Sequence, residues 1–179
     1  TRQNIQDLLS VEMAQKTEKN DRLFVFFAGH GQDYQAASGK TMGFFLPVDA
    51  DPRKLTSRGI SMDEVGTWSD LVPAKHILYV MDCCYSGIAA TRSSGLAQRH
   101  PSYLGTITSR PVRQIITAGR ADQKVIEESG QGVFTRVLVR GMRGAADLEG
   151  KGYVTGLNLG NYLTTRVFEE SRNRQEPQF

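Results

Sequence analysis

The sequence predicts an α/β fold with a mainly parallel central sheet, and three short apolar segments are the main reason for this prediction. Residues 22–28 (RLFVFFA), 76–81 (HILYVM) and 112–119 (VRQIITAG) are rich in β-branched and aromatic side chains. Continuous apolar runs of this kind are typical of strands that are buried on both faces of a parallel sheet. Segments with helical periodicity alternate with these strands, and this alternation is typical of α/β proteins.

The composition limits the classes of protein that the chain can belong to. It has 179 residues, 39% of them hydrophobic and 23% charged, which is typical of a single globular domain. No apolar run approaches the roughly 20 residues that a transmembrane helix needs, and no charged and apolar leader opens the sequence. The net charge is +3, and the basic residues are dispersed without interleaved aromatics. We therefore expect neither a membrane nor a nucleic acid as a partner.

The two cysteines of the chain, Cys83 and Cys84, stand side by side in the stretch MDCCYSG. A disulfide between sequence neighbours is strained, because its geometric requirements are demanding. Two cysteines also form no disulfide framework. Both are therefore expected to be reduced thiols in a reducing compartment, the cytoplasm.

The first half of the chain is predicted to hold two helices and a further strand. Residues 3–17 carry apolar side chains at the spacing of one helix face. Residues 43–48 (GFFLPV) form a short strand candidate. Ser61 is a helix N-cap candidate, and Glu64 three residues later completes a capping-box pattern, so a helix is expected over about 62–71.

The second half begins with a stretch that lacks periodicity. Residues 88–111 are rich in Ser, Gly, Arg and Thr, and they are expected to form a long mobile loop. Helices are expected over 133–142 and about 156–171, followed by a loose polar tail. The single domain is therefore divided into a first part (1–87), a flexible linker loop (88–111) and a second part (112–179).

Two strand ends place a histidine and a cysteine where the crevice of a parallel sheet lies. The first apolar strand is followed by GHG at residues 29–31, and the second by DCC at residues 82–84. Active sites of such sheets lie beyond the carboxyl ends of the strands. If the strands are parallel neighbours, His30 meets a cysteine there, and imidazole is the natural partner of a nucleophilic thiol. The adjacent glycine leaves the Gly31 N–H free to bind an oxyanion.

The separation of His30 and Cys84, 84 − 30 = 54 residues, is about that of the caspase histidine and cysteine. The sequence resembles the caspase-like cysteine peptidases (clan CD, peptidase C14), specifically the metacaspase and bacterial orthocaspase branch. The matching segments are FFAGHG (26–31), GFFLPVDAD (43–51), ISMDEV (60–65), VMDCCYSG (80–87), RQIITAGRADQ (113–123) and GVFTRVLVRGM (132–142). The resemblance covers nearly the whole chain and implies a caspase-like fold.

This resemblance implies the roles of the residues at the two strand ends. The family motif Asp-x-Cys-x-Ser-Gly identifies Cys84 as the nucleophile and leaves Cys83 as a packing residue. His30 matches the catalytic histidine. The backbone N–H groups of Gly31 and Cys84 match those that hold the oxyanion in the family. The implied activity is that of a cysteine endopeptidase.

The resemblance also implies which peptide bonds are cut. Asp82 matches the residue that lines the pocket for the side chain preceding the cut bond (P1), and Asp122 matches a second acidic position nearby. A buried carboxylate prefers a cation, so the expected substrates are proteins or peptides with Arg or Lys at P1. Family members often process themselves, and Arg92 and Arg99 in the predicted loop are the expected self-cleavage sites.

The family fold begins with a strand, a helix and a strand that precede the segment matched by residue 1. The resemblance therefore implies that this part of the same fold is a partner of the chain. Thiol chemistry of this kind needs no metal or organic cofactor. Calcium activates many metacaspases, but the stretch DLEGKGYVTGLN (147–158) fits a calcium loop poorly, because Lys151 occupies a ligand position.

Two alternatives to the peptidase remain. A catalytically silent, caspase-like regulatory or interaction module would share the fold without the reaction. A thiol redox protein would use both cysteines, but adjacent cysteines lack the two-residue spacer of redox motifs.

Overall fold

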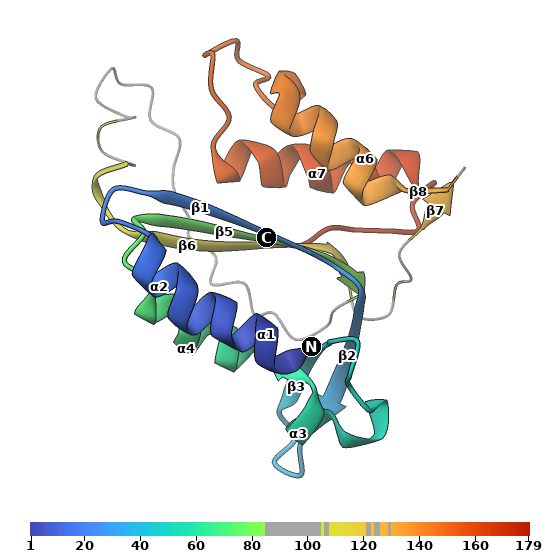
Figure 1. The fold of residues 1–179 in the computed structure, drawn as a ribbon. Coiled ribbons are helices and arrows are strands. Elements are labelled where there is room, and N and C mark those ends of the chain that lie inside the picture. Colours follow the sequence, from blue (N-terminus) through green and yellow to red (C-terminus); the bar gives the residue numbers. More distant parts are fainter. Residues whose placement is uncertain (85–104, 106–107, 121–122, 124–125, 129) are drawn as a thin grey trace.

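The computed structural model describes residues 1–84, 105, 108–120, 123, 126–128 and 130–179. Its centre is a parallel sheet with the order β1-β5-β6, formed by β1 (Arg22–Ala28), β5 (His76–Cys84) and β6 (Val112–Gly119). The carboxyl ends of these strands meet at one edge, on the right of Figure 1. All three strands lie where the apolar runs predict them, so the α/β fold with a parallel sheet is confirmed.

Helices cover both faces of this sheet (Figure 1). One layer is a continuous helix of α1 (Arg2–Asp7), the π-helical turn η1 (Leu8–Glu12) and α2 (Met13–Lys16), beside α4 (Met62–Leu71). The other layer consists of α6 (Val133–Arg140), the π-helical turn η3 (Gly141–Ala145) and α7 (Gly156–Glu170). Each layer buries its own apolar cluster against the sheet.

A second, antiparallel sheet lies beyond the carboxyl end of β1. It contains β2 (His30–Gln35), β3 (Thr41–Leu46) and β4 (Ile60–Ser61). The other short elements are η2 (Pro52–Lys54), α3 (Leu55–Arg58), β7 (Glu127–Glu128) and β8 (Gln131–Gly132). The strand expected near 43–48 is present as β3, whereas β2 is unexpected because a Gly-His-Gly sequence is typical of a turn.

The predicted capping box at the start of α4 is confirmed. The Ser61 Oγ accepts a hydrogen bond from the Glu64 N–H at 3.2 Å, and the Glu64 carboxylate accepts one from the Ser61 N–H at 2.8 Å. The helix then runs over Met62–Leu71, as the sequence predicts. The capping box satisfies two backbone donors at the helix start with residues of the same segment, so local chemistry indicates where α4 begins.

β1 is not buried on both faces, and that part of the prediction is wrong. Its side chains alternate between exposed and half-buried, and Phe24 and Phe26 are each 42% exposed. Leu23, Val25 and Phe27 pack instead against the cluster under α1 and α4. Within the described residues β1 pairs only with β5, so it is an edge strand, and its side chains Phe24 and Phe26 stay partly exposed.

The tail after α7 is packed against the sheet, which corrects the expectation that it is loose. The side chain of Gln175 is fully buried. Its Nε2 donates to the Ala118 carbonyl at 2.8 Å, and its Oε1 accepts from the Ile126 N–H at 3.0 Å. Gln178 forms an antiparallel bridge with Thr117 of β6. A glutamine can be buried here because both ends of its amide are satisfied.

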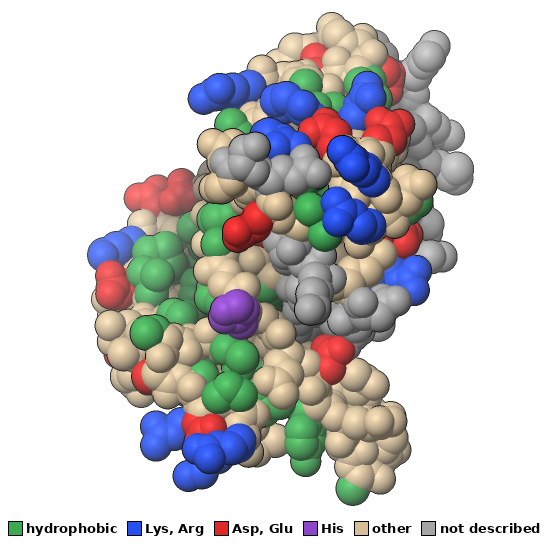
Figure 2. All heavy atoms as spheres, turned by 90° about the vertical axis from the view of Figure 1, so that its right-hand side faces the viewer, with side chains coloured by type: hydrophobic (Ala, Val, Ile, Leu, Met, Phe, Trp, Pro, Cys, Tyr) green, Lys and Arg blue, Asp and Glu red, His purple; other side chains and the backbone are tan. Residues whose placement is uncertain are grey.

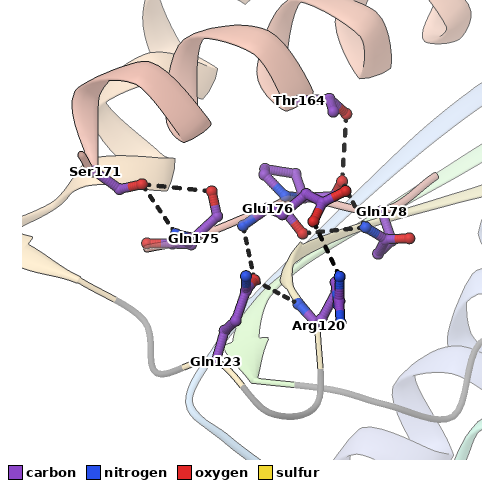
Figure 3. A network of polar contacts seen from close by, with 8 residues as sticks. Arg120, Gln123, Thr164, Ser171, Gln175, Glu176 and Gln178 are labelled. Atoms are coloured by element: carbon purple, nitrogen blue, oxygen red, sulfur yellow. Dashed lines mark hydrogen bonds and ion pairs between the residues drawn. The ribbon is translucent and has the colours of Figure 1, made fainter. Parts of the chain in front are cut away.

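The tail also holds the segment that follows β6. Figure 3 shows Gln123 between this segment and the tail, with its Oε1 accepting from the Glu176 N–H at 2.8 Å and from the Arg120 N–H at 3.2 Å. The Arg120 guanidinium also donates to the Glu176 carboxylate at 3.3 Å. The tail therefore connects α7 to the carboxyl end of the central sheet.

We expect Gln175→Leu to lower the free energy of unfolding by about 2–4 kcal/mol, because it removes the partner of the buried Ala118 carbonyl and of the partly buried Ile126 N–H. Gln178→Leu is the matched control, since within the described residues the Nε2 of Gln178 donates to carbonyls of its own tail, at 3.2 and 3.3 Å. Urea unfolding of both variants measures the difference. Equal stability of the two variants would show that the buried amide does not hold the tail.

Candidate active site

The turn between β1 and β2 presents His30 at the surface. The Gly29 N–H donates to the Asp82 carbonyl at 3.3 Å, so the backbone pairing with β5 continues past the end of β1. The Phe27 ring packs on Phe45 with its centroid 5.1 Å away, and a Cβ at Gly29 would lie only 2.9 Å from the Phe27 Cζ. Glycine at 29 therefore lets this ring lie against the turn, and the His30 side chain is exposed.

Cys84 is the last residue of β5 and pairs with Gly119 of β6. One residue of β6 lies between Gly119 and Thr117, which pairs with Met81, whereas two residues of β5 lie between Met81 and Cys84. β5 thus carries one extra residue between Met81 and Cys84. Irregularities of this kind bend a strand and are frequent beside active sites, where they redirect a side chain.

The structure brings His30 and Cys84 to the same edge of the sheet. Ala28 lies opposite Asp82 in the parallel pairing of β1 and β5, an offset of 82 − 28 = 54 residues. The same offset separates His30 from Cys84, and β2, which begins at His30, contacts β5. Figure 2 looks onto this side of the molecule and shows a histidine at its surface, with hydrophobic and acidic side chains around it.

Cys83 points away from this edge and is fully buried. It belongs to the apolar cluster that also contains Ile77, Tyr79 and Met81 of the same face of β5. Its thiol is free. The prediction that Cys83 is a packing residue is confirmed.

Asp82 lies on the opposite face of β5, against the start of α6. Its Oδ2 accepts a hydrogen bond from the Thr135 hydroxyl. A Cβ at Gly132 would lie 3.4 Å from the same oxygen, so the helix start is close to the carboxylate. Its other oxygen, Oδ1, is buried and has no hydrogen-bond partner among the residues that the structure describes.

Burial raises the pKa of the Asp82 carboxyl, the Thr135 hydroxyl lowers it, and the charge of Glu127 raises it further. A half-satisfied buried carboxylate is unfavourable unless a cation or a donor completes it. Perturbed carboxylates of this kind, at the carboxyl edge of a sheet, are typical of binding sites. Asp82 is therefore suited to hold a cationic group of a ligand.

The sequence did not assign a role to Thr135, although the segment GVFTRVLVRGM contains it. What the sequence offers at this position is a single hydroxyl among the apolar residues that begin α6. That signal identifies no partner, because the contact joins residues 53 positions apart. Only the packing of α6 on β5 reveals it.

Several predicted site residues are not tested. Asp122, Arg92 and Arg99 lie outside the described residues, as does almost all of the stretch 88–111, so the division into two parts and a linker stays a prediction. Gly31 lies in β2 opposite Phe45 of β3. Its role in an oxyanion hole also stays a prediction.

The stretch 147–158 is a turn followed by a helix start. The Asp147 carboxylate accepts from the N–H groups of Lys151 and Gly152 at 2.9 and 2.7 Å, and Thr155 caps α7 in a capping box with Asn158. No group of three or more His, Cys, Asp or Glu side chains in the described part of the chain is arranged to hold a metal ion. None of its described helices is both long enough and apolar enough to cross a bilayer.

Comparisons with known proteins agree with this geometry. The family model described as a metacaspase, peptidase C14 domain matches residues 1–92. A crystal structure of a structural genomics target from Geobacter sulfurreducens has the same fold, with a TM-score of 0.61 and 16% sequence identity over 100% of this chain and 72% of that one. The search of curated proteins found no match. The match to the family model covers more than half of the chain. The chain therefore belongs to the caspase-like peptidase family C14, as a metacaspase-type domain.

Proposed function

We propose that the chain is a cysteine endopeptidase that cleaves peptide bonds after Arg, and also after Lys, with Cys84 and His30 as its catalytic dyad. The observation that carries this proposal is the convergence of three strand ends at one edge of the sheet. His30 follows β1, Asp82 and Cys84 end β5, and Gly119 ends β6 beside Cys84. Peptide hydrolysis is the reaction of the family to which the chain belongs.

The reaction needs only groups that this edge provides. His30 takes the proton of the Cys84 thiol, and the thiolate attacks the carbonyl carbon of the substrate. The backbone N–H groups of Gly31 and Cys84 hold the oxyanion that forms. His30 then donates its proton to the leaving amine, and water hydrolyses the thioester to release the acid and the thiol.

Asp82 supports the proposed preference for a basic P1 residue. Its buried Oδ1 lacks a partner within the described part of the chain, and a guanidinium or an ammonium group would complete it. An acidic P1 side chain would place a second negative charge beside a buried carboxylate. The negative charge of Glu127 raises the pKa of Asp82, so the electrostatic surroundings of this carboxyl also favour a cation.

Two further proposals follow from the same family membership. The protein processes itself after Arg92 or Arg99, and mass spectrometry of the purified protein detects the resulting fragments, which Cys84→Ala would not produce.

The exposed edge of β1, with Phe24 and Phe26 at 42% exposure, receives a further strand of the same fold. Adding the preceding elements is expected to protect the β1 amides from hydrogen exchange, and unchanged exchange would contradict this docking.

The test is hydrolysis of fluorogenic peptides that differ only at P1. We expect cleavage after Arg, weaker cleavage after Lys and none after Asp, with and without added calcium. The preference arises because only a cationic P1 group pairs with Asp82. Cleavage after Asp alone would contradict the proposed pocket, and absence of any cleavage would favour a catalytically silent regulatory module.

A further inference from the structure

The contact between Thr135 and Asp82 joins α6 to strand β5 of the central sheet at the proposed P1 pocket. Thr135 lies in the first turn of α6, and its hydroxyl donates to the Asp82 Oδ2 across the carboxyl end of β5. The neighbouring residues of that turn, Val133 and Phe134, are fully buried, so the helix start is fixed in the core. The hydroxyl is therefore presented by a rigid element.

The two oxygens of the Asp82 carboxylate have different surroundings. Oδ2 accepts the hydrogen bond from Thr135 and lies beside Gly132, where an added Cβ would be 3.4 Å away. Oδ1 is buried and has no hydrogen-bond partner among the described residues. A carboxylate held through one oxygen keeps a fixed rotamer, so the other oxygen is available in a single position for an incoming cation.

We propose that Thr135 is a positioning residue for substrate specificity, which orients the Asp82 carboxylate so that Oδ1 receives the P1 cation. This inference rests on the proposed function, because it assumes that Asp82 contacts the P1 side chain. Thr135 itself does not touch the reacting atoms. Its hydroxyl acts only through Asp82, and α6 thereby contributes to the choice of substrate.

The hydroxyl also has a predictable effect on pH dependence. Its hydrogen bond lowers the pKa of Asp82, in opposition to burial and to the charge of Glu127, which both raise it. Without the Thr135 hydroxyl, burial and the charge of Glu127 raise the pKa of Asp82 with no hydrogen bond from Thr135 to oppose them. The protonated, uncharged form of Asp82 then persists to higher pH, and this form does not attract a cation.

The experiment compares Thr135→Val with Thr135→Ser, using hydrolysis of an Arg peptide as the readout. Valine has the shape of threonine without its hydroxyl, and we expect KM to rise about 10-fold with a smaller change in kcat, since a hydrogen bond to a charged group is lost. The acid limb of kcat/KM is expected to move to higher pH. Serine keeps the hydroxyl and should restore both properties.

Three controls separate positioning from folding. Thr67→Val removes an exposed hydroxyl on α4 that bonds only to the Asp63 carbonyl of its own helix, and should leave the kinetics unchanged. Alkylation of Cys84 by iodoacetamide, measured against pH in a Cys83→Ala background, should be the same with Thr or Val at position 135. In an Asp82→Asn background, Thr135→Val should have no further effect, because residues that act through one another are not additive.

The outcomes distinguish this inference from the function on which it rests. Wild-type cleavage after Arg that depends on Asp82 but not on the Thr135 hydroxyl would overturn the inference alone. A Thr135→Val protein with altered Cys84 alkylation would overturn it too, by showing that the substitution disturbs the dyad and not the pocket alone. Absence of Arg cleavage in the wild type, or its persistence in Asp82→Asn, would overturn the proposed function and this inference with it.

Discussion

Replacing Cys84 with alanine is expected to reduce hydrolysis of Arg peptides by at least about 10³-fold, because no other group can form the thioester. His30→Ala is expected to cause a loss of similar size, since the thiol then lacks its proton acceptor. The double variant should be little worse than either single variant, because the two residues act as a unit. Initial rates with a saturating Arg peptide measure these effects.

Cys83→Ala is the matched control for this prediction. Its thiol is fully buried in the apolar cluster of β5, so its loss should leave the rate of hydrolysis within a small factor of the wild type. Melting temperatures of all variants show whether a loss of rate reflects unfolding. Thiol labelling of the two single variants tests the redox alternative, since a redox pair needs both cysteines and a peptidase needs only Cys84.

Replacing Asp82 with asparagine is expected to lower kcat/KM for an Arg peptide by about 10²-fold or more, because the cation at P1 loses a buried charged partner. A peptide with an uncharged P1 residue should lose much less. The ratio of the two kcat/KM values isolates the pocket from the dyad. An unchanged ratio would show that the basic group is held elsewhere.

The same substitution is expected to stabilise the folded chain at neutral pH. Burial raises the pKa of Asp82, so the folded state binds this proton more tightly than the unfolded state does. The stability that the wild type has at low pH therefore declines as pH rises from the unfolded pKa through the raised folded pKa. The Asp82→Asn variant carries no such charge. At a pH above this range, its melting temperature should exceed that of the wild type. Loss of function with gain of stability is the expected mark of a binding residue.

The sequence predicts the central elements because their causes are local or periodic. The capping box that begins α4 joins Ser61 and Glu64, which are three residues apart, although Arg2 also donates to the Glu64 carboxylate. The apolar runs of β5 and β6 are long enough, and rich enough in β-branched residues, to define buried strands. The pairing of a histidine and a cysteine at adjacent strand ends then follows from the parallel arrangement.

The features that the sequence does not predict depend on contacts between distant residues. The exposure of Phe24 and Phe26 depends on the place of β1 at the edge of the sheet, which an apolar run does not reveal. Gln175 is polar and lies near the end of the chain, yet Ala118 and Ile126 satisfy its amide in the core. Thr135 becomes relevant to the site only through its hydrogen bond to Asp82, which lies on β5 and not on α6.

The central claim is that Cys84 is a nucleophile beside a pocket for a basic side chain, and one covalent labelling measurement tests both parts together. The protein is treated with a peptidyl-arginine acyloxymethyl ketone, which alkylates a thiol that attacks its carbonyl, and the adduct is located by mass spectrometry. We predict a single adduct on Cys84, slow labelling of Asp82→Asn, and no labelling by the aspartyl analogue. An adduct on Cys83, or equal labelling by the arginyl and aspartyl reagents, would contradict the claim.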